Sequence, residues 1–160
     1  ATRLGADPRT AAAGLEDFEQ TGMRQHMVEH GGVTVIEDCY NANPDSMAAA
    51  LAMFREYPCQ RRYALLGDML ELGDTSRASH EQLGALAAAC GLDGLVTYGS
   101  EAKRTAVVAA AKGVQTVHAA THAEAAETLA KWVRPGDAVL VKASRGMALE
   151  KALALFYAQS

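Results

Sequence analysis

Short apolar runs alternate with helical patterns along most of this 160-residue chain. Residues 63–66, 95–98, 115–118 and 138–141 each have the length and apolar character of a strand, and a helical pattern follows each of them. Successive parallel strands need a crossover connection, usually a helix, so this order predicts a mainly parallel sheet with helices on both faces. We therefore expect a three-layer, Rossmann-like α/β domain with about six strands.

The start of the chain departs from this alternation. Residues 26–29 and 33–37 are predicted to be strands joined by the Gly31-Gly32 turn, and this hairpin would place one antiparallel strand at an edge of the sheet. Residues 1–21 fit the unit poorly and contain a helical pattern, so we interpret them as the tail of a preceding domain. The α/β domain itself would then span residues 22–160.

Several helix ends carry clear sequence signals. Asn43 is a predicted N-cap with Pro44 at the first helical position, and Thr121 with Glu124 forms a predicted capping box. Gly91 is a predicted C-cap. The helix that starts at Pro44 is expected to bury the apolar residues spaced along one face, which are Met47, Ala50, Leu51 and Phe54.

Composition limits the classes of function. The net charge of −4 gives no basic surface for nucleic acid, and no apolar run is long enough to span a bilayer. Three cysteines are too few, and odd in number, for a disulfide framework, which favours a reducing compartment. We expect a monomeric cytoplasmic protein that binds neither nucleic acid nor membrane.

Polar residues follow the predicted strands at their carboxyl ends. The loops in question are residues 38–43, 67–73, 99–100 and 142–146. In an open parallel sheet ligands bind outside the carboxyl ends of the strands, so these loops predict a binding site at one edge.

The first loop offers ligand contacts and also has simpler interpretations. Asp38 is placed to accept a hydrogen bond from a ribose hydroxyl, as carboxylates at strand ends do in nucleotide-binding crevices. Asn41 and Asn43 each offer donors and acceptors to a ligand. Asn41 is alternatively a turn former, and Asn43 is alternatively a helix cap and nothing more.

The last loop is cationic. Lys142, Ser144 and Arg145 stand before a helix and suit a carboxylate or phosphate, although they also fit a solvated helix start. Asp68 either contacts a ligand or simply ends its strand. His80, on the next helix, is more typical of a packing or surface residue than of a catalytic base.

Sharper catalytic motifs are missing from the sequence. Residues 99–105 lack the glycine before lysine that a phosphate loop needs, and no Gly-x-Gly-x-x-Gly follows a strand. The histidines and cysteines have no metal-ligand spacing, so we expect no metal site, and no Ser-His-Asp pattern is present. The candidate residues therefore indicate a ligand-binding site rather than a set of catalytic groups.

Three motifs together resemble the carboxyl-terminal domain of the Mur ligases, and among them the branch that adds D-alanyl-D-alanine. They are DCYNANPDSM at residues 38–47, LGDMLELG at residues 66–73 and VKASR at residues 141–145, with His80 and Gly84 at the family's spacing. The resemblance covers the whole chain and assigns residues 1–21 to the end of the family's central ATPase domain.

The resemblance implies an ATP-dependent amide ligase of peptidoglycan synthesis. ATP would phosphorylate the carboxylate of UDP-N-acetylmuramoyl-tripeptide, and the amine of D-Ala-D-Ala would attack the acyl phosphate. The cofactors implied are ATP and magnesium, the latter held mainly by the central domain, and the partners are the two preceding domains of the same polypeptide. The isolated domain would be inactive.

The resemblance also assigns residues to ligands. It places Arg24 near the ATP phosphates as the catalytic arginine, and Asp38 and Asn41 at ATP. The residues it assigns to D-Ala-D-Ala are Asn43, Asp68, Lys142, Ser144 and Arg145.

Two positions depart from the family pattern. Ala143 stands where glycine is frequent, and its methyl group would crowd the backbone near the dipeptide. Glu37 stands where a second aspartate is common. The alternatives left open are another ligase of the superfamily, such as a folylpolyglutamate synthetase, and a free-standing nucleotide- or dipeptide-binding module.

Overall fold

The structure is a computed structural model that describes residues 25–159. Six strands form one sheet in the order β1-β2-β6-β3-β4-β5. β1 pairs antiparallel with β2, and the other neighbouring strands pair in parallel. The strands are β1 (His26–His30), β2 (Val33–Asp38), β3 (Arg62–Gly67), β4 (Gly94–Tyr98), β5 (Thr116–Ala119) and β6 (Ala138–Lys142). This arrangement confirms the predicted α/β fold with an antiparallel edge strand.

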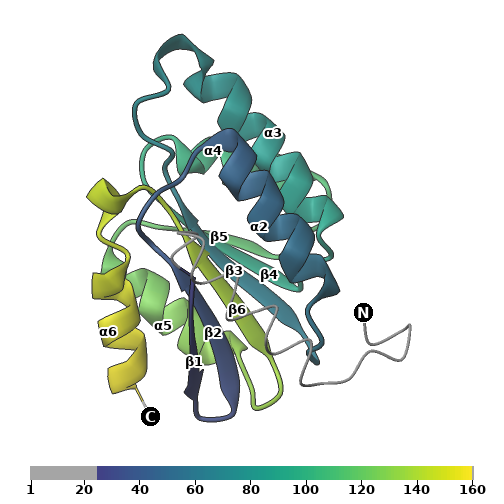
Figure 1. The fold of residues 1–160 in the computed structure, drawn as a ribbon, viewed down its shortest axis with the longest axis vertical. Helices are drawn as coiled ribbons and strands as arrows, with labels where there is room; N and C mark the ends of the chain where they lie inside the picture. The colour runs from purple at the N-terminus through teal and green to yellow at the C-terminus, as the bar shows by residue number, and fades with distance from the viewer. Residues whose placement is uncertain (1–24, 160) are drawn as a thin grey trace.

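Within residues 25–159, five α-helices cover the two faces of the sheet. α2 (Pro44–Glu56), α3 (Ser76–Ala89) and α4 (Ala102–Ala111) lie on one face, and α5 (His122–Trp132) and α6 (Glu150–Ala158) lie on the other (Figure 1). The short 3-10 helices η3 (Gly73–Thr75) and η4 (Arg145–Met147) interrupt loops of the described part of the chain. Arg24 and residues 1–21, for which roles were predicted, lie outside the described residues.

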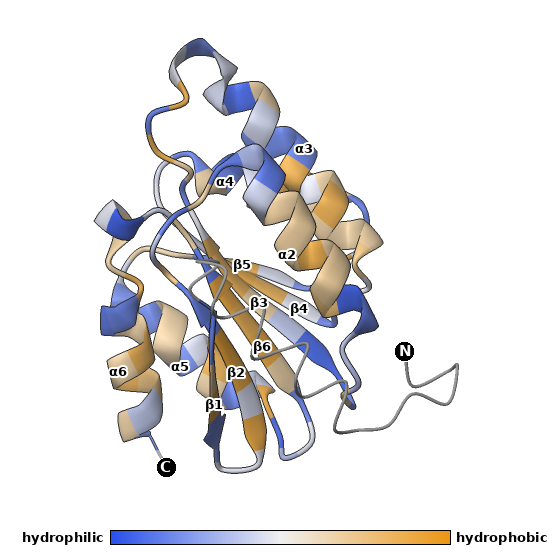
Figure 2. Ribbon diagram, viewed as in Figure 1, coloured by the Kyte–Doolittle hydropathy of each residue, from blue (hydrophilic) through white to orange (hydrophobic). Residues whose placement is uncertain are grey.

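Each face of the sheet has its own core, because side chains alternate along a strand. In β6, Val139 and Val141 pack with α5 and α6, whereas Leu140 packs with α2 and α3. Figure 2 shows the apolar character concentrated along the central strands. Leu153 and Phe156 of α6 are buried in the core that faces α5 and α6.

The predicted helix starts are largely confirmed. The side chain of Asn43 accepts a hydrogen bond from Ser46 N, and Ser46 Oγ accepts one from Asn43 N, which completes a capping box. At α5, Thr121 Oγ1 accepts from Glu124 N, but the Glu124 carboxylate accepts from Ala120 N rather than from Thr121 N. The reciprocal bond of the predicted box is therefore displaced by one residue.

The buried face of α3 includes the polar residue His80 together with Gly84. Leu86 is half-buried in a surface groove between α2 and α3. A Cβ atom added to Gly84 would lie 2.6 Å from the Thr105 carbonyl oxygen. The two helices approach so closely here because glycine has no side chain, and this contact brings His80 against α4.

Candidate functional site

The loops that follow β2, β3, β4 and β6 meet at the carboxyl edge of the sheet. The parallel register places both Asp38 of β2 and Leu66 of β3 beside Lys142 of β6, so β6 lies between β2 and β3. Every described residue that was predicted to contact a ligand lies at this edge, in one of these loops or at the end of the strand before it. The topology therefore gathers them as expected.

A buried ion pair joins the first and last loops. Lys142 Nζ donates to Asp38 Oδ2 at 2.8 Å and to the Asn41 carbonyl oxygen at 2.9 Å. The two charged side chains are only 4% and 5% exposed. In this arrangement the ammonium group holds the neighbouring loop, and the direct contact with a ligand carboxylate stays a prediction.

Ser144 ties three loops together. Its Oγ accepts a hydrogen bond from Leu70 N at 2.9 Å and donates to the Ala42 carbonyl oxygen at 3.4 Å. Its backbone N–H donates to the Asp68 carbonyl oxygen at 3.1 Å. Because the residue is buried, these contacts make it a support for the loops around it.

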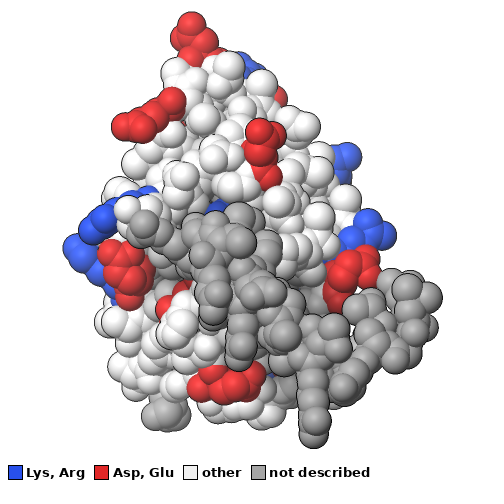
Figure 3. Space-filling model, viewed as in Figure 1, with Lys and Arg blue, Asp and Glu red and all other residues white. Residues whose placement is uncertain are grey.

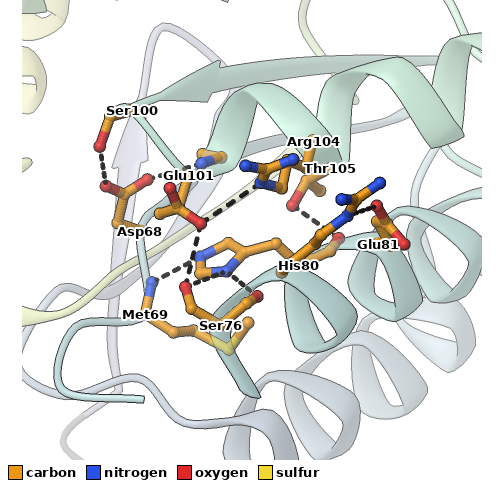
Figure 4. A network of polar contacts seen from close by, with 11 residues as sticks. Asp68, Met69, Ser76, His80, Glu81, Ser100, Glu101, Arg104 and Thr105 are labelled. Atoms are coloured by element: carbon orange, nitrogen blue, oxygen red, sulfur yellow. Dashed lines mark hydrogen bonds and ion pairs between the residues drawn. The ribbon is translucent and has the colours of Figure 1, made fainter. Parts of the chain in front are cut away.

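Asp68 connects the end of β3 to the start of α4 (Figure 4). Its carboxylate accepts hydrogen bonds from Ala102 N at 2.6 Å and from the Ser100 hydroxyl at 3.5 Å. A Cβ atom added to Gly99 would lie 2.3 Å from Asp68 Oδ1, and the φ of Gly99 is +118°. The short loop between β4 and α4 thus depends on glycine at this position.

Three of the predicted ligand residues are exposed, namely Asn41, Asn43 and Arg145. Asn43 uses its side-chain oxygen to cap α2, so the simpler interpretation of this residue describes at least one of its contacts. The guanidinium carbon of Arg145 lies 5.3 Å from the centre of the Tyr40 ring, an arrangement typical of a cation–π contact. Sequence reasoning missed Tyr40, although its position beside Asn41 in the same motif was the available signal.

Arg145 and Tyr40 line an open hollow together with Glu37, Cys39 and Glu150. Figure 3 shows basic and acidic atoms side by side on the flank of the molecule where η4 and α6 lie. The exposed guanidinium group suits a carboxylate or a phosphate at this place.

The groups that line this hollow are not poised for nucleophilic chemistry. Burial, followed by the nearby Glu37 carboxylate, raises the pKa of the Cys39 thiol to about 12, so the thiol stays protonated at neutral pH. Glu37, one of the two departures from the family pattern, accepts a hydrogen bond from the Tyr157 hydroxyl of α6. Its longer side chain therefore links β2 to the last helix.

Ala143, the other departure, is fully buried, and a Cβ atom added to Gly67 would lie 2.6 Å from the Ala143 Cβ. The methyl group therefore fills the space that Gly67 leaves between β3 and β6. Its expected effect on a bound dipeptide stays a prediction.

Residues 25–159 contain no helix with the length and apolar character needed to cross a membrane. They also contain no group of three His, Cys, Asp or Glu side chains arranged to hold a metal ion.

Comparison with protein families gives a match over most of the chain. The family model described as "Mur ligase, glutamate ligase domain" matches residues 23–145. A UDP-N-acetylmuramoyl-tripeptide–D-alanyl-D-alanine ligase of Mycobacterium leprae is 41% identical over 136 residues, covering 74% of this chain and 26% of that protein. The ligase of the same name from Treponema pallidum is 38% identical over 154 residues, covering 94% of this chain and 33% of that protein.

Solved structures give the same result. A MurF ligase from Thermotoga maritima in complex with ADP superposes with a TM-score of 0.75 at 30% identity, covering 86% of this chain and 31% of that one. A MurF from Acinetobacter baumannii superposes with a TM-score of 0.76 at 29% identity, covering 84% of this chain and 30% of that one. The chain spans about a quarter to a third of the length of these relatives.

Proposed function

This chain belongs to the Mur ligase family, and on that premise we propose that it is the carboxyl-terminal domain of a ligase that joins D-Ala-D-Ala to UDP-N-acetylmuramoyl-tripeptide. The ligase uses ATP, passes through an acyl phosphate and works in the cytoplasm as a monomer. Residues 22–160 are this domain, and residues 1–21 are the end of the ATPase domain that precedes it. Relatives with this name support the assignment. The chain matches only 26% and 33% of their length, as a single domain of the ligase would.

The single observation that carries the proposal is that buried and exposed polar residues at the carboxyl edge make different contacts. The buried residues Asp68, Lys142 and Ser144 bond to the loops themselves, whereas the Arg145 guanidinium stays exposed above Tyr40. A rigid edge with an accessible cation suits a small anionic substrate, because preorganised contacts lose less entropy on binding. Arg145 would therefore hold the carboxylate of the dipeptide.

The remaining residues complete the proposed site. Asn41 is exposed beside the ion pair and would contact ATP, and the second oxygen of the Asp38 carboxylate would accept from the ribose. Asn43 would reach the dipeptide through its amide nitrogen, because its oxygen caps α2. Arg24 would lie near the ATP phosphates and stabilise the phosphoryl group during its transfer.

The edge fits an anionic ligand but offers no set of magnesium ligands within residues 25–159. When bound, magnesium would screen the phosphate charges of ATP, and we assign its ligands to the preceding domains. What this domain contributes is binding, orientation and the exclusion of water from the reacting groups.

An assay with the full-length parent enzyme tests the proposal. The parent should form the amide only when UDP-N-acetylmuramoyl-tripeptide, ATP and D-Ala-D-Ala are all present, and the 160-residue chain alone should form none. A parent that accepts glutamate but not the dipeptide would disprove the substrate assignment. Calorimetry on the chain alone provides the second check, since tight ATP binding there would favour a free-standing module.

A further inference from the structure

His80 is a fully buried polar side chain for which the proposed site has given no role. Its Nε2 atom lies 3.0 Å from the backbone nitrogen of Met69, and its Nδ1 atom lies 2.8 Å from the Ser76 carbonyl oxygen (Figure 4). A backbone N–H can only donate, so Nε2 must be the acceptor. The proton therefore sits on Nδ1, where it is donated to Ser76, and both neighbours specify the same tautomer.

The Met69 N–H is one of two adjacent anchors in the loop after β3. The next N–H, that of Leu70, is bound by Ser144 Oγ from the loop after β6. Two consecutive backbone donors are thus held by buried side chains from different elements. The residue that follows, Glu71, has a φ of +64°, which a residue with a side chain adopts only when its surroundings impose it.

Ser76 contacts the His80 ring, whereas Thr105 contacts only the His80 backbone. Ser76 Oγ lies 3.3 Å from His80 Nδ1 and donates to the Glu101 carboxylate at 3.1 Å. That bond lowers the pKa of the Glu101 carboxyl group, with a further contribution from Arg104. On the other side, Thr105 Oγ1 donates to the His80 carbonyl oxygen at 2.9 Å.

We propose that His80 is a positioning residue: as the Nδ1–H tautomer it fixes the backbone of residues 68–71 at the edge where the dipeptide binds. The link to the dipeptide rests on the proposed function. The tautomer and the anchoring of the loop rest on the hydrogen bonds alone. A histidine that merely filled space in the core would have neither a fixed tautomer nor a specific effect on one substrate.

Substitutions in the full-length parent separate the two roles. His80→Leu keeps the apolar volume but removes the acceptor, so the KM for D-Ala-D-Ala should rise about tenfold while the KM for ATP changes less than about twofold. His80→Gln places an amide oxygen where it can accept from Met69 N–H, and it should bring the KM back to within about threefold of the wild-type value. Thr105→Val is the matched control, because it removes a buried hydrogen bond of the same helix pair that does not reach the loop.

Two measurements on the unmodified protein keep the proposal testable if His80→Leu does not fold. The imidazole ¹⁵N signals should show Nε2 without a proton and Nδ1 with one, and the Met69 amide should exchange with solvent as slowly as the amides of the central strands. An Nε2–H tautomer or a rapidly exchanging Met69 amide would overturn the proposal. So would equal KM values for His80→Leu and wild type.

The outcomes also separate this proposal from the proposed function. If the wild-type parent does not use D-Ala-D-Ala, the substrate assignment fails, and the ¹⁵N and exchange measurements still decide whether His80 anchors the loop. If the parent uses the dipeptide and His80→Gln is as impaired as His80→Leu, the substrate assignment stands and the positioning role fails.

Discussion

The two ends of the sheet each hold a buried aspartate that pairs with a cation, and the two pairs differ in how far water reaches them. At the carboxyl edge, the side chains of Lys142 and Asp38 are 4% and 5% exposed. At the amino edge, Asp137 is 1% exposed, but its partner Arg61 is 44% exposed. The amino-edge pair therefore keeps its cation in water, whereas the carboxyl-edge pair has given up the hydration of both charges.

This difference shows how the two edges are built. Asp137 bonds to Arg61, which is 76 residues away in the sequence, and it also accepts from Arg134 N three residues earlier, so a local turn supports this pair. Lys142 instead reaches a carboxylate that is 104 residues away in the sequence and a carbonyl group in the same loop. Burying two charges is unfavourable unless their partners are well placed, and at the carboxyl edge the buried pair fixes a loop that has no regular structure.

The largest expected effect comes from breaking the buried pair on one side. Lys142→Met leaves the Asp38 carboxylate buried without a cation, which should reduce the free energy of unfolding by about 3–5 kcal/mol. The Asp38→Leu/Lys142→Met double variant removes both charges and should lose much less. Urea unfolding of the chain measures both.

Arg61→Ala is the comparison at the amino edge. It should lower the unfolding midpoint only slightly, because water already screens the guanidinium and Asp137 keeps its bond to Arg134 N. A Lys142→Met variant as stable as Arg61→Ala would contradict the distinction between the two pairs.

The two edges also differ in how much room they leave for a side chain at a glycine position. Gly99 at the carboxyl edge and Gly136 at the amino edge have φ values of +118° and +95°, and an added Cβ would clash at both. At Gly99 the clash is with the Asp68 carboxylate, which is held by Ala102 N, whereas at Gly136 it is with the flexible Gln60 side chain. Gly99→Ala should therefore destabilise the chain by about 3 kcal/mol or more, and Gly136→Ala by about 1–2 kcal/mol. Thermal unfolding compares them, and equal losses would show that only the backbone angle matters.

The sequence predicted which residues gather at the carboxyl edge of the sheet, but not the hydrogen bonds and ion pairs among them. Strand and helix positions follow from local apolar spacing, and the predicted bounds of the six strands differ from the observed ones by one residue at most. The Lys142–Asp38 contact depends on β6 entering the sheet between β2 and β3, which joins residues far apart in the sequence. His80 was expected to be a packing or surface residue, and its burial follows from the close approach of two helices at Gly84. Such contacts are properties of the assembled fold and have no local sequence signal.

A substitution at the exposed cation should affect binding without affecting stability. Arg145→Ala in the full-length parent should raise the KM for D-Ala-D-Ala about tenfold, because one charge-assisted contact with the dipeptide carboxylate is lost. Unfolding of the chain should change by less than about 0.5 kcal/mol, as at other surface positions. Arg61→Ala is again the control, since it should leave the KM unchanged. An unchanged dipeptide KM in Arg145→Ala, with intact folding, would refute the assigned role.

The smallest expected effect concerns residues in the left-handed backbone conformation. The two edges place different residue types in this conformation. At the amino edge Gly31 has a φ of +58° with open space around it, whereas at the carboxyl edge the non-glycine residue Glu71 has a φ of +64°. A side chain in this conformation costs about 1–2 kcal/mol, and glycine loses about half of that advantage through its greater freedom in the unfolded chain. Glu71→Gly should therefore raise the free energy of unfolding by about 0.5 kcal/mol, and Gly31→Ala should lower it by a similar amount in the same urea titrations. If Glu71→Gly instead lowered stability, the Glu71 side chain would have to make favourable contacts that exceed the backbone strain, and the loop would then be held from both sides rather than only by the anchors at Met69 and Leu70.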